Sequence, residues 1–360
     1  MTRGRILGFA TLCLASALAA GAYAYRALQR TSSPAQNERA GGAAGNSPGA
    51  VVAAALPGPP GALFLFRNTA IDSSYGRLAT APIENVADRR VISMLSCERV
   101  DYAAGRGVCL ALAGRGVMTT YSAIVFDQDF QPVFTLRLGG IPSRVRVAPD
   151  GRLAAVTVFV SGHSYASGNF STVTSIIDLH KGSYVIPNFE ALAVWRGEQR
   201  FEAVDRNFWG VTFARDSDTF YATVAGGGLT HLIKGTVSDQ RATVLHDDVE
   251  CPSLSPDNKR VAFKRRVREG SAPVHWALAV LDLSTMDEVL LREAHSVDDQ
   301  VAWLDNDRIM YALPATEGGS AEMNTWVIDV RGTGSPRLLV PQSYSTVVWL
   351  PPPDGRALPR

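Results

Sequence analysis

The chain has 360 residues, of which 46% are hydrophobic, so it can bury a substantial core and is not disordered throughout. Its 35 Lys and Arg residues balance 34 Asp and Glu residues, which gives a net charge of +1. A chain without a broad positive field is not suited to capturing nucleic acid, and we exclude that partner. The short basic run at 264–266 is interpreted as a solvated strand edge protected against aggregation.

Residues 1–28 are predicted to be a signal anchor. Arg3 and Arg5 precede an uncharged, mostly apolar run at 6–25, which as a helix reaches about 30 Å and is long enough to cross a membrane. The alternative is a cleavable signal peptide, because 17–19 and 22–24 both resemble small-residue cleavage sites. The first interpretation predicts a single-pass protein of the cell membrane with its folded part outside the cytoplasm. The second predicts a secreted or periplasmic protein.

Residues 29–61 are rich in Gly, Ala, Ser and Pro and show neither period nor charge pattern. Such a composition is typical of a flexible linker. The folded domain is predicted to cover 62–360, and the linker would hold it at a distance from the membrane.

A strand–turn–strand pattern recurs along this domain. Its clearest copy is LSPDNKRVAFK at 254–264. Weaker copies occur at 99–112, 146–158, 211–224, 301–313 and 347–358. Consecutive copies are 41 to 66 residues apart, and short strands at such a period are typical of a β-propeller.

The two ends of the domain are incomplete in complementary ways. Segments 62–66, 75–83 and 89–95 read as three strands with no preceding copy of the turn, whereas the last copy is followed by no further strand. A propeller removes its exposed sheet edges by closing. We therefore expect 345–351 to supply the inner strand of a blade whose other strands come from 62–95. With five continuous blades, the predicted fold is an all-β, six-bladed propeller.

Six aspartates are predicted to shape turns, because each lies in a hairpin turn or at the end of a strand. An Asp in such a position can accept hydrogen bonds from backbone N–H groups two residues further on. Repetition once per blade favours this structural role over a catalytic or calcium-binding role. The six residues are Asp127, Asp150, Asp178, Asp257, Asp282 and Asp329.

Cys97 and Cys109 are predicted to form a disulfide, since an exported chain permits oxidation and the two residues flank one hairpin turn. Counting outward from the turn places them on opposite strands, at a separation that a disulfide accepts. Cys251 is expected to be a buried free thiol. No catalytic, cofactor-binding or metal-binding motif is found, and no cofactor is expected.

The third continuous blade contains extra material at 188–208, flanked by Trp195 and Trp209. This insertion and the loop at 161–171 differ from the other copies and are expected to be variable contact surfaces. If exposed, the two tryptophans would be suitable contact anchors.

The pair LSPDNKRVAFK and LAVLDLSTMDEVLL (278–291) resembles the repeat of TolB-type propellers, a WD-repeat-like family. RVAPDGRLAAVTV (146–158) with SIIDLHKGSYVI (175–186) is a second match. The resemblance covers about 96–350 and implies a six-bladed propeller. The two-domain member of that family has an α/β domain ahead of its propeller, where this chain has an anchor and a linker.

These observations predict a membrane-tethered, non-enzymatic propeller that binds a protein or peptide of the cell envelope and is itself a monomer. One alternative is a lyase or glycoside-acting propeller enzyme with a site at the channel mouth, for which His163 is the first candidate residue. Another is a sensory ectodomain that binds a small ligand.

Overall fold

The computed structural model describes residues 61–86, 90–115, 119–161, 170–267, 274–316 and 318–350. The predicted anchor, nearly all of the linker, His163 and the end of the last repeat lie outside these ranges. Within the described ranges, we find no helix that is long and apolar enough to span a membrane.

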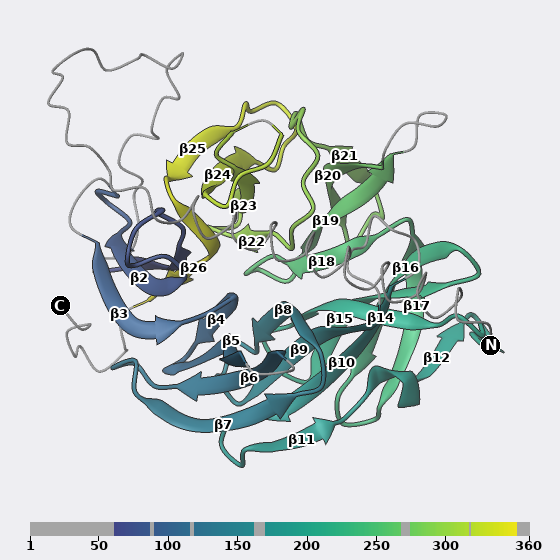
Figure 1. Ribbon diagram of the computed structural model, residues 1–360. Helices are drawn as coiled ribbons and strands as arrows, with labels where there is room; N and C mark the ends of the chain where they lie inside the picture. Colours follow the sequence, from purple (N-terminus) through teal and green to yellow (C-terminus); the bar gives the residue numbers. More distant parts are fainter. Residues whose placement is uncertain are drawn as a thin grey trace, which may run out of the picture. The chain divides into compact units, whose positions relative to one another are not determined.

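Six sheets, antiparallel except for one parallel pair in the third, form the six blades of a propeller, as the sequence predicted (Figure 1). The first blade contains β4 (Arg99–Ala103), β5 (Arg106–Arg115), β6 (Thr119–Phe126) and β7 (Pro132–Leu138). The second contains β8 (Ile141–Val147), β9 (Leu153–Ser161), β10 (Ser171–Asp178) and β11 (Ser183–Ile186). The fourth contains β18 (Glu250–Leu254), β19 (Arg260–Val267), β20 (His275–Asp282) and β21 (Glu288–Leu290). The fifth contains β22 (Ala302–Trp303), β23 (Arg308–Pro314), β24 (Met323–Asp329) and β25 (Arg337–Val340).

The composite blade closes the ring in the predicted way. It contains β26 (Ser343–Trp349), β1 (Leu63–Asn68), β2 (Arg77–Pro82) and β3 (Val91–Ser96), in this order. β1 pairs with the C-terminal strand β26 in antiparallel register, with Leu63 opposite Trp349. The Arg90 guanidinium strengthens the junction because it donates to the carbonyl oxygens of Pro341 and Gln342.

The insertion at 188–208 enlarges the third blade to six strands. The core of this blade contains β14 (Asn207–Phe213), β15 (Thr219–Gly226), β16 (Leu229–Thr236) and β17 (Arg241–Asp247). The insertion contributes the 3-10 turn η2 (Phe189–Ala191), β12 (Ala193–Arg196) and β13 (Gln199–Arg200). β12 adds to β17 in parallel, so the inserted residues extend the outer edge of the sheet.

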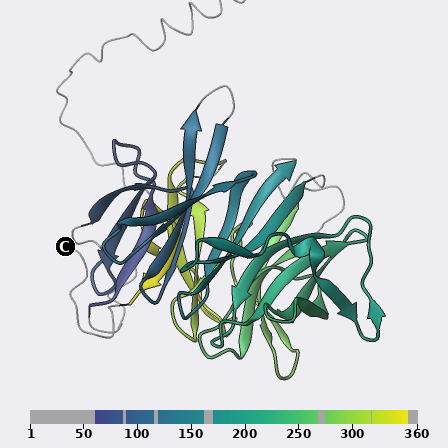
Figure 2. The same cartoon turned by 90° about the horizontal axis from the view of Figure 1, so that it is seen from below.

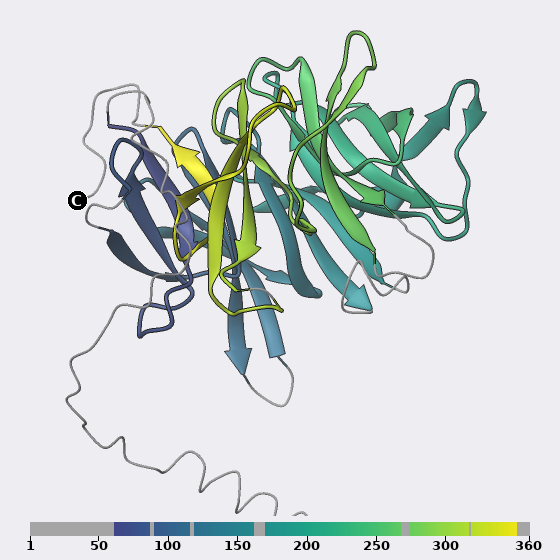
Figure 3. The ribbon, with the colours of Figure 1, turned by 90° about the horizontal axis from the view of Figure 1, so that it is seen from above.

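Apolar side chains fill the spaces between adjacent blades, because the internal strands of each sheet are covered on both faces. β14 is buried along its whole length, whereas the outer strand β3 alternates between half-buried and exposed residues. Figures 2 and 3 show the hairpin of β5 and β6 projecting beyond the neighbouring strands on one face of the ring. The blades therefore differ from one another mainly at the faces of the ring and at its outer edges.

Candidate functional site

The inner strands of the six blades surround a central channel. β4, β8, β14, β18, β22 and β26 each form one end of their sheet and contact one another around the ring. All six run in the same direction, so their N-terminal ends meet at one mouth and their C-terminal ends at the other. We call these the charged mouth and the turn-side mouth, after the residues described next.

Three consecutive residues, Asp298, Asp299 and Gln300, cross the channel and form what we call the channel plug. Asp299 pairs with Arg99 on β4, with a distance of 3.1 Å between Oδ1 and Nη1. Gln300 Nε2 donates to the carbonyl oxygens of Val211 on β14 (3.1 Å) and Pro252 on β18 (3.0 Å). The plug thus joins the fifth blade to the first, third and fourth.

The charged mouth lies on the outer side of the plug, where Asp298 bridges two cations. Its carboxylate contacts Lys264 Nζ on β19 and lies 3.7 Å from Nη2 of Arg144 on β8. The Lys264 side chain is fully buried, and that of Arg144 is 5% exposed, whereas that of Asp298 remains 42% exposed. Burial alone would raise the pKa of Asp298, but attraction to Lys264 and Arg144 outweighs it and holds this pKa below its ordinary value.

The basic run 264–266 is therefore not the solvated strand edge that the sequence suggested. β19 lies between β18 and β20, and hydrogen bonding on both sides makes it an internal strand. Lys264 Nζ and the Arg266 guanidinium lie over the Trp276 ring, at 4.1 and 4.9 Å from its centroid. The error arose because sequence alone does not distinguish an edge strand from a central one.

Glu250 is another acid at the charged mouth, and its side chain is fully buried. Its Oε1 accepts from Arg266 Nη2 at 2.8 Å, whereas its Oε2 is buried without a hydrogen-bond partner among the described residues. Burial raises the pKa of Glu250, against the opposing attraction of Lys264 and Arg266. These carboxylates and cations form a polar network beneath the N-terminal ends of the inner strands.

The turn-side mouth is a hollow of about 250 Å³, to which all six inner strands contribute. Its walls combine apolar and polar residues: the apolar part includes Tyr102, Phe213, Leu254, Trp303 and Val348, and Thr212 and Ser253 are among the polar residues. Trp303 is fixed in orientation because its Nε1 donates to the Ser253 carbonyl oxygen at 2.8 Å.

A buried ion pair forms the polar part of this hollow. Asp101 Oδ2 accepts from the backbone N–H of Val147 at 2.6 Å, and Asp101 Oδ1 lies 3.9 Å from Arg146 Nη1. Burial raises the pKa of Asp101 above its ordinary value, and the attraction of Arg146 offsets this only in part. Aromatic and apolar side chains together with a few polar groups give the hollow the composition of a binding pocket.

The repeated turns form the rim of this mouth and connect neighbouring blades. The backbone N–H of Asp150 donates to Ser217 Oγ of the next blade, and that of Asp257 donates to Asn306 Oδ1. Gly151 has φ +71°, and a Cβ there would lie 2.9 Å from the Ala103 carbonyl oxygen, so this close approach requires glycine. The repeat therefore builds the ring and the rim together.

All six predicted aspartates accept a hydrogen bond from the backbone N–H two residues further on. At Asp178 and Asp282, the same carboxylate oxygen also accepts from the N–H three residues on. The six residues are Asp127, Asp150, Asp178, Asp257, Asp282 and Asp329. They lie in separate turns, and the structure does not gather them into one site.

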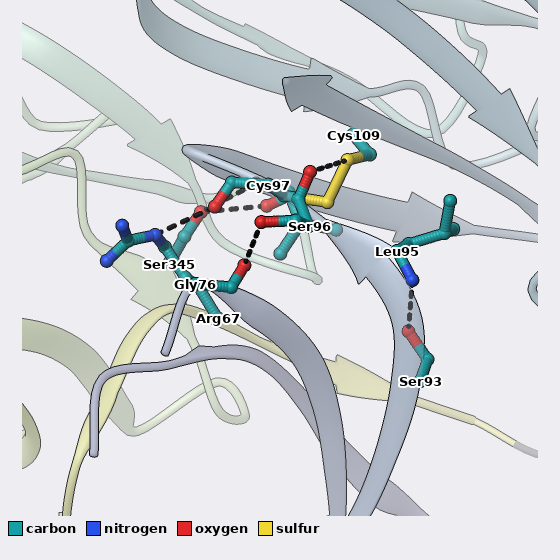
Figure 4. Close-up of a disulfide and its surroundings, with 9 residues drawn as sticks. Arg67, Gly76, Ser93, Leu95, Ser96, Cys97, Cys109 and Ser345 are labelled. Carbon is teal, nitrogen blue, oxygen red and sulfur yellow. Dashed lines mark hydrogen bonds between the residues drawn. A yellow bond between two sulfur atoms is a disulfide. The ribbon is translucent and has the colours of Figure 1, made fainter. Parts of the chain in front are cut away.

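Cys97 and Cys109 form the predicted disulfide, with a Cα–Cα separation of 5.3 Å (Figure 4). The reasoning that placed them opposite each other was wrong. Val100 is the residue opposite Cys109, whereas Cys97 lies between β3 and β4. The bond therefore fastens the link between two blades to β5, and Arg67 Nε donates to the Cys97 carbonyl oxygen at 2.7 Å. Cys251 is a buried free thiol, as expected.

The two tryptophans beside the insertion do not form the exposed pair considered above. Trp209 is 1% exposed and stacks edge-on against Phe170. Trp195 is half-buried, and the Arg241 guanidinium lies over its indole, with Cζ 4.6 Å from the ring centroid. Trp209 is a core residue and cannot act as a contact anchor.

Sequence reasoning missed the channel plug and the cations that hold it. Asp298 and Asp299 are adjacent and precede the shortest inner strand, but only the closed ring brings Arg99, Arg144 and Lys264 to them. Among the described residues, no group of three or more His, Cys, Asp or Glu side chains is placed to hold a metal ion.

The chain is a six-bladed β-propeller, and its fold is similar to that of TolB. The crystal structure of TolB from Acinetobacter baumannii matches with a TM-score of 0.53 at 15% identity, over 80% of this chain and 66% of that chain. The structure of putative TolB from Agrobacterium tumefaciens matches with a TM-score of 0.47 at 10% identity, over 78% of this chain and 89% of that chain. No family model and no curated protein matches the sequence. At these identities, the likeness establishes the fold alone.

Proposed function

We propose that this propeller is a non-enzymatic binding module of the cell envelope that takes an extended segment of a protein partner into its turn-side mouth. The observation that carries the proposal is the hollow to which all six inner strands contribute, in which aromatic and apolar side chains lie beside the Asp101–Arg146 pair. Rigid aromatic walls of this kind are suited to anchoring an apolar side chain. The resemblance of the repeat to TolB-type propellers supports the envelope location.

The size of the hollow limits what can enter it. A volume of about 250 Å³ is smaller than the pockets that enclose drug-sized ligands, and it accommodates one or two side chains. Tyr102, Phe213 and Trp303 would contact an inserted apolar side chain. The exposed Pro149 and Pro256 on the rim would contact the backbone on either side of it.

The membrane tether is part of the same proposal. The uncharged run at 6–25 would anchor the chain and the linker at 29–61 would project the propeller outside the cytoplasm. Protease treatment of intact and of permeabilised cells tests the location. Degradation of the propeller only after the inner membrane is permeabilised would contradict it.

Site-specific photo-cross-linking in intact cells tests the binding site. A photoreactive residue at Pro256 should give a cross-linked partner, and the same residue at Val133, which is 46% exposed on β7, is the matched control. The substitution P149R, placed on the rim two blades away, should reduce the Pro256 cross-link at least tenfold, whereas V133R should not. Partner cross-links at Val133 in place of Pro256 would overturn the proposal.

A further inference from the structure

The inner strand of the fifth blade is shortened at the charged mouth. β22 has two residues, whereas β4 and β18 have five and β8, β14 and β26 have seven. The plug occupies the position where further residues of β22 would continue the channel wall. The fifth blade therefore fills the channel with a loop whose side chains point to the other blades.

Side chains hold the plug more than backbone pairing does. Among the described residues, the backbone hydrogen bond nearest to it is from the Val297 N–H to the Trp276 carbonyl oxygen, at 3.0 Å. Asp298 and Asp299 are held by their contacts with Lys264, Arg144 and Arg99 described above. A segment attached in this way can leave its position without opening a sheet.

The residues that receive the plug belong to regular strands of other blades. Arg99 begins β4, Arg144 lies within β8, and Lys264 lies within the central strand β19. Cations fixed by strands form a preorganised receptor for carboxylates. The two carbonyl oxygens that accept from Gln300 extend this receptor by one position.

We propose that the charged mouth is a binding site for an acidic peptide and that the channel plug is its internal competitor. The ligand class is a segment with two adjacent acidic residues followed by an amide side chain. Its first carboxylate would replace Asp298 between Lys264 and Arg144, and its second would replace Asp299 at Arg99. The 42% exposure of Asp298 makes its position accessible from the charged mouth.

Competition with a tethered segment sets the expected affinities. The plug is present at a high effective concentration, so a free peptide binds only to the fraction of molecules whose plug has left the receptor. Weakening the plug without changing the receptor increases that fraction. The acidic peptide should then bind more tightly, which distinguishes competition from a purely structural role of the plug.

The probe is the synthetic peptide acetyl-Ser-Val-Asp-Asp-Gln-Val-amide, which copies the sequence at 296–301. Its matched control carries Asn at both Asp positions. Binding to the full chain is measured by calorimetry and by tryptophan fluorescence, to which Trp276 contributes. The variant D298N/D299N, which keeps side-chain shape and removes the competing charges, should bind the acidic peptide at least tenfold more tightly than the wild type and should not bind the Asn peptide.

A second variant tests the proposal independently, in case D298N/D299N does not fold. Q300A keeps both carboxylates and removes only the two bonds to carbonyl oxygens, and it should bind the acidic peptide a few-fold more tightly than the wild type. V133R on the outer strand β7 should leave the affinity of Q300A unchanged when combined with it. The proposal is overturned if D298N/D299N and Q300A are folded and neither binds the acidic peptide more tightly than the wild type does, or if both peptides bind equally. Either result leaves the cross-links at the turn-side mouth unaffected.

Discussion

The two mouths of the channel are built from the same six inner strands but differ in chemistry. At the charged mouth, carboxylates of the plug are bound by cations from three other blades. At the turn-side mouth, aromatic and apolar side chains lie beside the Asp101–Arg146 ion pair. The difference shows that copies of one repeat can build a uniform rim at one end of a channel, while a segment between two copies fills the other end.

The origin of this difference lies in which residues recur. The turn-side rim consists of the repeated turns, whose aspartates fix the backbone in the same way in successive blades. The charged mouth instead depends on the segment before β22 and on three cations, Arg99, Arg144 and Lys264, which lie on strands of the repeat but contact the plug only in the closed ring. The contacts of the plug are not repeated in the other blades, and we therefore expect substitutions at the charged mouth to have the larger effects.

The largest expected effect is that of D298A at the charged mouth. Removing the carboxylate that contacts Lys264 and Arg144 should lower the free energy of unfolding by about 3 kcal/mol, the lower end of the range for breaking a buried ion pair, because Asp298 is partly exposed. Urea denaturation measures the change. P256A on the turn-side rim is the control and should change stability by less than about 0.5 kcal/mol. Equal changes in the free energy of unfolding for D298A and P256A would contradict the difference between the two mouths.

The disulfide should have a slightly smaller effect. The bond fastens the chain just before the N-terminal end of β4. In the double variant C97S/C109S, the free energy of unfolding should fall by about 2–3 kcal/mol, as expected for a disulfide that closes a short loop. Urea denaturation of the wild type with and without reductant should give a similar difference. Adding reductant to the double variant is the control, and a stability change there would point to a cause other than this bond.

The acids of the two mouths should give opposite pH dependences. The pKa of Asp298 is lowered in the folded protein, so its stabilisation is present above the ordinary value of 3.8 and is lost as the pH falls through the folded value. The pKa of Asp101 is raised, so its contribution is present below 3.8 and is lost as the pH rises through the folded value. We expect D298N to reduce the pH dependence of the free energy of unfolding below pH 3.8, and D101N to reduce it above pH 3.8. Urea denaturation at a series of pH values measures both. A reduction in the same pH range would contradict this assignment.

The smallest effect is expected at a single repeated turn. In D257A, the hydroxyl of Ser255 loses its acceptor and the N–H of Lys259 keeps only Ser255 Oγ, so the free energy of unfolding should fall by about 1 kcal/mol. D257N keeps an acceptor oxygen and should lose less than half of that amount, as measured by thermal or urea denaturation. A loss as large as that of D298A would mean that the turn-side rim is as critical as the charged mouth.

Several features followed from the sequence because they depend on local patterns. The repeat predicted six blades and the closing strand at 345–351, since turn type and strand alternation depend on residues that are close together in the sequence. The turn role of Asp257 followed from its recurrence at Asp150. The Cys97–Cys109 bond was also predicted, although the register behind the argument was shifted by three residues.

Other features required the folded ring. The sequence could not show that β19 is a central strand, and so Lys264 was taken for a solvated residue. Trp209 looked suitable as a contact anchor until its burial was known. The partners of Asp298 and Asp299 lie 34 to 200 residues away along the chain.

The sequence by itself determined the fold class, the way in which the ring closes, the turns and the cysteine pair, because each depends on residues close together in the chain or on a period. Only the tertiary structure decided which residues meet in the channel. Electrostatic contacts act between side chains that are near in space, and closing the ring brings together four blades around three residues of the fifth. The contacts between the plug and its three cations, and the hollow at the turn-side mouth, arise from that closure.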